Sequence, residues 1–199
     1  GSSVLGGAGA DEISLIGTIA LSATTILGGG GADQIVISGI VAGDSQINGD
    51  SSADGGGADT IDLGGVGNSL VSATIKGKGG ADEITISGAM GNSARVEGNA
   101  GADIITLSGG FGGIAAFAGG GSGNDTITIF TGITDSANSI RGGGGTDSIS
   151  FVDGGVVSEQ ASGTIIFGGA GADTIELGLI ETGSNAIDRG SRGHSGYIG

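Results

Sequence analysis

The segment Gly28-Gly29-Gly30-Gly31-Ala32-Asp33-Gln34-Ile35-Val36-Ile37 decides the fold, because it joins a glycine loop, an aspartate and an alternating apolar stretch. The chain contains eight copies of this unit, beginning near residues 6, 28, 54, 77, 98, 120, 142 and 168. The fourth loop position is always glycine: Gly9, Gly31, Gly57, Gly80, Gly101, Gly123, Gly145 and Gly171. The sixth is always aspartate: Asp11, Asp33, Asp59, Asp82, Asp103, Asp125, Asp147 and Asp173. These aspartates are 22, 26, 23, 21, 22, 22 and 26 residues apart, a period typical of a solenoid.

Two strands are expected in each period. An apolar residue follows each aspartate by two and by four positions, which is the alternation of a half-buried strand. The first column is Ile13, Ile35, Ile61, Ile84, Ile105, Ile127, Ile149 and Ile175, and the second is Leu15, Ile37, Leu63, Ile86, Leu107, Ile129, Phe151 and Leu177. A return strand precedes each loop, with a small residue two positions before an apolar one, as in Ala73-Thr74-Ile75 and Ala115-Ala116-Phe117.

Two strands and two turns per coil predict an all-β protein. We expect a right-handed parallel β-roll, or β-solenoid, with two sheets and about eight coils, and residues 1–199 as a single repeat domain. The far turn, rich in Gly, Asn and Ser, is expected to vary in length. Ser51, Ser52 and Ala53 are interpreted as extra residues before a third loop that starts at Asp54. A degenerate ninth loop spans 190–195, with Ser195 in the aspartate position.

Composition excludes several classes of protein. Glycine accounts for 50 of 199 residues, but proline is absent and no three-residue period exists, so the chain is not collagen-like. The net charge of −15 argues against nucleic-acid binding, which needs Lys and Arg on the phosphates. No apolar run approaches the ~20 residues of a membrane span, so no membrane insertion is expected. One histidine and no cysteine offer no nucleophile–base pair, so we expect no enzyme.

The aspartates are the candidate metal ligands. Stacked coils would place them about 4.8 Å apart, where bare carboxylates repel one another. Glycine lets the backbone turn carbonyl oxygens toward the gaps, near Gly9, Gly31, Gly57, Gly80, Gly101, Gly123, Gly145 and Gly171. Carboxylate and carbonyl oxygens are the ligands that Ca²⁺ prefers. The sequence therefore predicts about seven Ca²⁺ ions in single file along one edge. The alternative is that Gly and Asp merely reverse the chain, as they do in ordinary turns.

The loops resemble the RTX, or haemolysin-type, calcium-binding repeat, Gly-Gly-x-Gly-x-Asp-x-apolar-x, which forms parallel β-rolls. Five loops match its first six positions, those that end at Asp11, Asp33, Asp125, Asp147 and Asp173. In the other three, Asp54 replaces the first glycine, and Lys78 and Asn99 replace the second. The resemblance implies Ca²⁺ shared between neighbouring coils. It also implies secretion, with folding outside the cell. The family carries calcium loops on both edges, whereas this chain has one loop per ~22-residue coil.

Two functions are open at this stage. The first is an extracellular or cell-surface structural protein of the fibre, surface-layer, biofilm-matrix or adhesin-stalk type. Its partners would be copies of itself end to end, or other cell-surface or matrix components. The alternative is a calcium-triggered folding and secretion module of a larger RTX toxin or protease. Ice binding by outward threonines is disfavoured, because Glu12, Glu83 and Glu176 interrupt the array.

Overall fold

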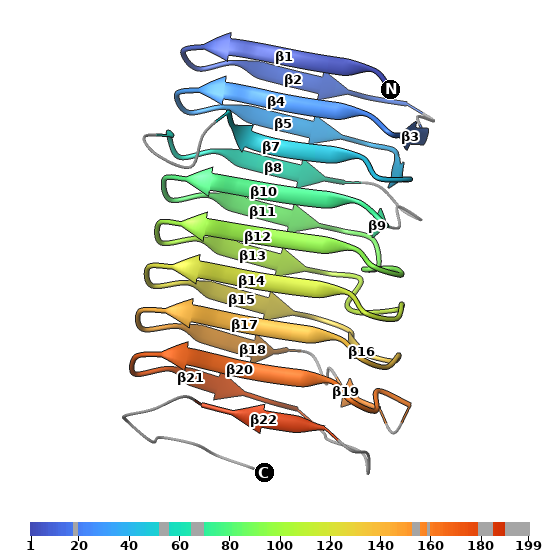
Figure 1. Ribbon diagram of the computed structural model, residues 1–199, viewed down its shortest axis with the longest axis vertical. Coiled ribbons are helices and arrows are strands. Elements are labelled where there is room, and N and C mark those ends of the chain that lie inside the picture. The colour runs from blue at the N-terminus through green and yellow to red at the C-terminus, as the bar shows by residue number, and fades with distance from the viewer. Residues whose placement is uncertain are drawn as a thin grey trace.

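The computed structural model describes residues 1–17, 20–51, 56–64, 70–152, 156–158, 160–178 and 185–189. Every regular element in these ranges is a β-strand, and the strands stack in parallel as a β-solenoid of about eight turns (Figure 1). The predicted fold class is confirmed. The described part of the chain contains no helix long and apolar enough to cross a membrane.

Two large parallel sheets form the main faces. The nine-stranded sheet contains the return strands, in the order β1 (Ser3–Ala8), β4 (Thr25–Gly30), β7 (Gln46–Asp50), β10 (Thr74–Gly79), β12 (Arg95–Ala100), β14 (Phe117–Ser122), β17 (Ser139–Gly144), β20 (Ile165–Ala170) and β22 (Ala186–Asp188). The eight-stranded sheet contains the strands that follow the aspartates, in the order β2 (Glu12–Leu15), β5 (Gln34–Ile37), β8 (Thr60–Leu63), β11 (Glu83–Ile86), β13 (Ile104–Leu107), β15 (Thr126–Ile129), β18 (Ser148–Phe151) and β21 (Thr174–Glu176).

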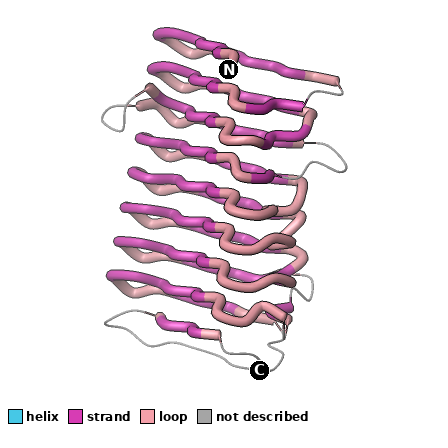
Figure 2. Tube along the Cα trace, turned by 45° about the vertical axis from the view of Figure 1, so that its right-hand side comes forward, coloured by secondary structure: helices cyan, strands magenta, loops and turns pink. Residues whose placement is uncertain are grey.

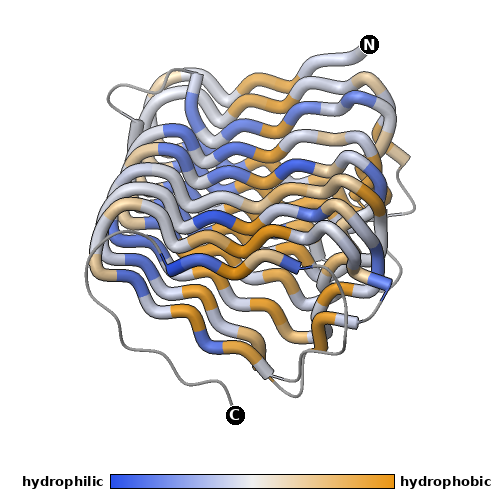
Figure 3. Tube along the Cα trace, turned by 60° about the horizontal axis from the view of Figure 1, so that its bottom comes forward, coloured by the Kyte–Doolittle hydropathy of each residue, from blue (hydrophilic) through white to orange (hydrophobic). Residues whose placement is uncertain are grey.

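The core is a set of apolar columns between these sheets. Each strand pairs in register with the same strand of the next coil, so that Ile84 lies between Ile61 and Ile105. The column two positions after the aspartates is buried throughout, as predicted. Leu15 and Leu177, in the end coils, are only partly buried. Figure 3 shows these apolar columns running through the stack.

The far turn contains a third short face, which the sequence analysis missed. Strands β3 (Ala20–Ser22), β6 (Ile40–Ala42) and β9 (Leu70–Val71) form one small parallel sheet, and β16 (Gly132–Ile133) and β19 (Val156–Val157) form another. Single bridges through Met90 and Phe111 join the two series. Figure 2 shows the turns of successive coils stacked on one another. Their buried side chains form a further core column: Leu21, Val41, Leu70, Met90, Phe111, Ile133 and Val157. Segments of two or three residues are too short to show a period in the sequence.

The predicted register of the fifth return strand was wrong by one residue. Ala118, and not Phe117, pairs with Val96 and Ile140 in the buried column. The distance to the loop sets this register, because the buried residue always lies two positions before the first loop glycine. A slip of one residue turns a side chain to the other face of a sheet, so Phe117 lies on the outer face.

The third loop begins earlier than predicted. Gly29 pairs with Asp50 in the nine-stranded sheet, so Gly49 and Asp50 occupy the first and second loop positions. Residues 51–55 are therefore an insertion inside the loop, before Gly56, and not extra residues ahead of it. Asp54 lies outside the described residues, and so does the predicted ninth loop at 190–195. The return strand before that ninth loop is present as β22, where Ile187 pairs with Ile166.

Candidate cation site between the glycine loops

The eight glycine loops lie along one edge of the solenoid and connect the nine-stranded sheet to the eight-stranded sheet (Figure 1). Most loops turn through glycines with positive φ at the second and fourth positions, such as Gly29 (132°) and Gly31 (117°). Close stacking adds a second requirement. A Cβ on Gly101 would lie less than 3.0 Å from the Gly80 carbonyl oxygen. The repeated glycines therefore allow both the turn and the approach of one coil to the next.

The aspartates point to the inside of the loops. Seven are at most 3% exposed, and Asp11 in the first coil is half-buried. They form one continuous ladder, in which the backbone N–H of each aspartate donates to Oδ1 of the aspartate one coil further on. The seven bonds measure 2.7–2.9 Å and run from Asp11 to Asp173. Each carboxylate from Asp33 to Asp173 thus crosslinks two coils through one of its oxygens.

The other carboxylate oxygen has no partner. Oδ2 is buried without a hydrogen bond in all eight loop aspartates. Near the first loop glycine, it lies on the same side as a carbonyl oxygen of the following coil. A Cβ on Gly28 would lie less than 3.0 Å from both Asp33 Oδ2 and the Gly49 carbonyl oxygen, and Gly142 has the same arrangement with Asp147 and Gly168. Oxygen atoms from two coils therefore gather at a place that only glycine leaves open.

The predicted carbonyl oxygens also lie between the coils. The carbonyl oxygen of each fourth-position glycine approaches the Cβ position of the next one to less than 3.0 Å, from Gly9 against Gly31 through to Gly145 against Gly171. All eight predicted aspartates and these carbonyls are thus brought to one edge. The sequence analysis missed Asp50, which is also buried there. Aligning Gln46-Ile47-Asn48-Gly49-Asp50 with Thr25-Ile26-Leu27-Gly28-Gly29 would have revealed it.

Burial acts against the charged form of these carboxyl groups. Desolvation raises the pKa of Asp59 and of Asp125 to about 6, and that of Asp82 to about 7, from 3.8. Neighbouring carboxylates in the ladder raise these pKa values further, whereas the hydrogen bond from the preceding amide lowers them. The pKa values of Asp103 and Asp147 are raised for the same leading reason. A proton or a cation would relieve the cost of burying these groups.

The donor set fits a hard cation such as Ca²⁺. Within the described ranges, no three His, Cys, Asp or Glu side chains form a metal-binding group. An ion here would therefore have one or two carboxylates, and backbone carbonyls would supply most of its ligands. Ca²⁺ accepts carbonyl and carboxylate oxygens in irregular arrangements, whereas Mg²⁺ demands an octahedron. The unpartnered Oδ2 atoms and the nearby carbonyls meet this requirement.

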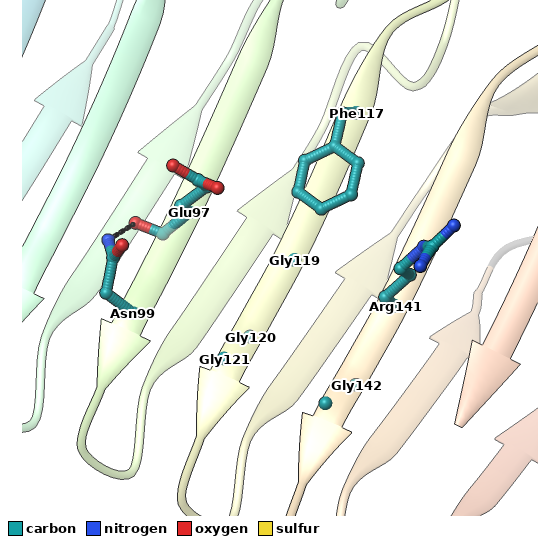
Figure 4. A pocket seen from close by; sticks show the side chains of 9 residues that line it. Glu97, Asn99, Phe117, Gly119, Gly120, Gly121, Arg141 and Gly142 are labelled. Carbon is teal, nitrogen blue, oxygen red and sulfur yellow. Dashed lines mark hydrogen bonds between the residues drawn. The ribbon is translucent and has the colours of Figure 1, made fainter. Parts of the chain in front are cut away.

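A hollow on the outer face is a separate feature. It measures about 180 Å³ and lies over glycines of β14 and β17, between Glu97, Asn99, Phe117 and Arg141 (Figure 4). Glu97 pairs with Arg95 and, at 3.0 Å, with Lys76, and the Arg95 guanidinium lies 4.1 Å from the centre of the Phe117 ring. This basic and aromatic cluster faces away from the aspartates, which lie on the inner side of the loops.

Comparison with known proteins found no match: no protein-family model, no curated protein and no solved structure resembles this chain significantly.

Proposed function

We propose that this chain is an extracellular structural solenoid whose glycine loops bind Ca²⁺ between successive coils. The observation that carries the proposal is the column of eight buried Oδ2 atoms without hydrogen-bond partners. Leaving a buried carboxylate oxygen unpaired is costly, and an ion shared by two coils would remove that cost at every loop. The resemblance of the loops to the RTX repeat supports the same ion.

Calcium would then make folding depend on whether the chain lies inside or outside the cell. A coil buries few large side chains and must order four to seven glycines, each of which loses much conformational freedom. Binding of an ion to the folded chain, but not to the unfolded chain, stabilises the fold in proportion to the logarithm of ion concentration. Millimolar Ca²⁺ outside the cell would favour the solenoid, and the low Ca²⁺ concentration of cytosol would not.

A structural role follows from the shape of the stack. Apart from the third, the loops on the aspartate edge are short, and among the described residues β1 and β2 are the outermost strands of the two main sheets at one end, and β21 and β22 at the other. The ladder of aspartate hydrogen bonds is directional, so a second copy stacked with the same polarity would continue the sheets. We therefore propose end-to-end assembly into a fibre, surface layer, biofilm matrix or adhesin stalk.

The test is electron microscopy and calcium titration of the purified chain. We expect Ca²⁺ to raise the unfolding temperature by an amount that grows with its concentration, and we expect filaments that dissolve in EGTA. Monodisperse monomers that bind Ca²⁺ would contradict the assembly and favour a calcium-triggered folding module of a larger protein. A chain whose stability is independent of Ca²⁺ would overturn the whole proposal.

A further inference from the structure

The third glycine loop differs from the others by one buried carboxylate. Asp50 occupies its second position, where the other loops have glycine, Lys78 or Asn99. Its side chain is 1% exposed, and neither of its oxygens has a hydrogen-bond partner at 3.5 Å or less, although the backbone groups of Gly57 and Gly79 lie near enough to favour its charged form. Among the described residues, it is the only carboxylate with both oxygens in that condition.

The backbone explains why Asp50 turns inward. Lys78 and Asn99 adopt positive φ values of 92° and 80° at this position, and they are only half-buried. Asp50 does not have a positive φ, and strand β7 ends at it, whereas the neighbouring strand β4 continues to the third loop position. The insertion at 51–55 follows directly. The changed path of the chain thus directs a carboxylate into the loop where other loops have none.

Asp50 lies in a loop where carboxylate oxygens and carbonyl oxygens of the next coil come close to the same glycines. A Cβ on Gly56 would lie less than 3.0 Å from both Asp50 Oδ2 and the Gly79 carbonyl oxygen of the next coil. A Cβ on Gly49 would lie equally close to Asp59 Oδ2 and the Gly77 carbonyl oxygen. The third loop therefore contains two such pairs of oxygens, one beside Gly49 and one beside Gly56. The carboxylates of Asp33 and Asp50 also act electrostatically on Asp59, and the carboxylate of Asp50 acts on Asp82 in the next coil.

We propose that the third loop holds a tighter cation site than the other loops, in which Asp50 and Asp59 supply carboxylate oxygens and Gly77 and Gly79 supply carbonyl oxygens. The identity of the ion as Ca²⁺ rests on the proposed function. Two carboxylates match the charge of one divalent cation, and the affinity of oxygen sites for Ca²⁺ rises with the number of charged ligands. This site would therefore fill first as Ca²⁺ is added and would fix the third coil before the others.

The nearest competing explanation is charge balance by Lys78. This residue lies one coil further along the same edge, and its charge favours the ionised form of Asp50. No ion pair joins the two side chains at 4.0 Å or less among the described residues. At more than 4.0 Å, the Lys78 ammonium group offsets part of the negative charge of Asp50, but it donates no hydrogen bond to either buried oxygen.

The experiment measures ion stoichiometry in the full chain. Calcium binding is followed by isothermal titration, and Tb³⁺ luminescence reports the order of filling. Asp50→Asn keeps the shape of the side chain, and Asp50→Gly restores the residue that most loops have. Asp44→Asn is the matched control, because Asp44 is exposed and its φ of 60° suits asparagine equally well. We expect both Asp50 variants to lose the tightest binding step, so that the third loop binds no more tightly than the other loops, while the control binds as the unaltered chain does.

The outcomes separate this inference from the proposed function. If the unaltered chain binds several Ca²⁺ ions and both Asp50 variants bind the same number with the same affinities, the third-loop site is wrong and the proposed function stands. If Lys78→Met then lowers the stability of the metal-free chain while Asp50→Asn restores it, charge balance by lysine explains Asp50. If the unaltered chain binds neither Ca²⁺ nor Tb³⁺, both proposals fail.

Discussion

At the scale of single residues, the two oxygens of each loop aspartate have different roles. Oδ1 accepts the backbone N–H of the preceding coil, whereas Oδ2 is buried without a partner. The first role needs only an acceptor, which an amide oxygen also provides. The second depends on charge, because only a carboxylate attracts a cation there. An asparagine substitution therefore separates the two roles.

We predict that Asp82→Asn makes the metal-free chain more stable at pH 8 and reduces its stabilisation by Ca²⁺. Asparagine keeps the acceptor for the Asp59 amide and removes a buried charge. Thermal unfolding with and without Ca²⁺ measures both effects. The exposed change Asp44→Asn should alter neither quantity. Loss of stability without Ca²⁺, together with an unchanged response to the ion, would contradict the division of roles.

Glycine at the fourth loop position gives a second prediction. Gly101→Ala places a Cβ against the Gly80 carbonyl at a φ of 139°, and a side chain in such a conformation costs roughly 1–3 kcal/mol before the clash is counted. Gly144→Ala is the control, since a Cβ there would meet no atom within 4 Å and φ is not positive. Urea unfolding in saturating Ca²⁺ should show a clear loss for Gly101→Ala and no loss for Gly144→Ala. Equal effects would mean that stacking at the loops is loose.

At the scale of the strands, stability comes from columns in register. Ile105 in β13 is fully buried between Ile84 and Ile127, whereas its neighbour Ile104 is 49% exposed on the outer face. Of these two successive residues, one is fully buried and the other is about half exposed. This is the alternation that the sequence shows, and it offers a matched pair for mutation.

We predict that Ile105→Ala lowers the free energy of unfolding by about 2–5 kcal/mol, because it leaves a cavity in a layer that both adjacent coils line. Ile104→Ala should change it by less than about 0.5 kcal/mol. Denaturant unfolding of both variants at one Ca²⁺ concentration makes the comparison. A similar loss from the two substitutions would contradict the assignment of inner and outer faces.

At the scale of the whole molecule, the stacked carboxyl groups make stability depend on pH. Burial raises the pKa of Asp59 and Asp125 to about 6 and of Asp82 to about 7, from 3.8. An acid whose pKa is higher in the folded state stabilises the fold below its unfolded pKa, and this contribution is lost as pH rises through the folded pKa. In the metal-free chain, the ladder thus favours folding at pH 4 and opposes it at pH 8.

We therefore predict that the unfolding temperature of the metal-free chain falls between about pH 4 and pH 7. Saturating Ca²⁺ should abolish most of this fall, because a bound ion replaces the proton at each carboxylate. Scanning calorimetry across that pH range, in EGTA and in millimolar Ca²⁺, tests both parts. A metal-free chain that becomes more stable as pH rises would show that the ladder is not the dominant titrating unit.

The sequence by itself determined the repeat, the two main sheets and the aspartate column. Each of these follows from a local period: glycine and aspartate at fixed loop positions, and isoleucine two residues after every aspartate. Such periods are visible in the sequence, because every coil makes the same contacts with the coil above it and the coil below it. The sequence could not supply what depends on contacts between coils. The short third face, through Met90 and Phe111, pairs single residues with no period of its own.

The inward turn of Asp50 and the outward turn of Phe117 were likewise decided by tertiary structure. For Phe117, pairing with adjacent coils fixed the register, and a shift of one residue exchanges the inner and outer faces. Asp50 keeps the register of the other loops, and its different backbone conformation turns the side chain inward. The same packing holds Ala23, Ser72, Ala115 and other non-glycine residues at positive φ where each coil enters the nine-stranded sheet. No local preference predicts that conformation, since its cost is offset only when the coils stack.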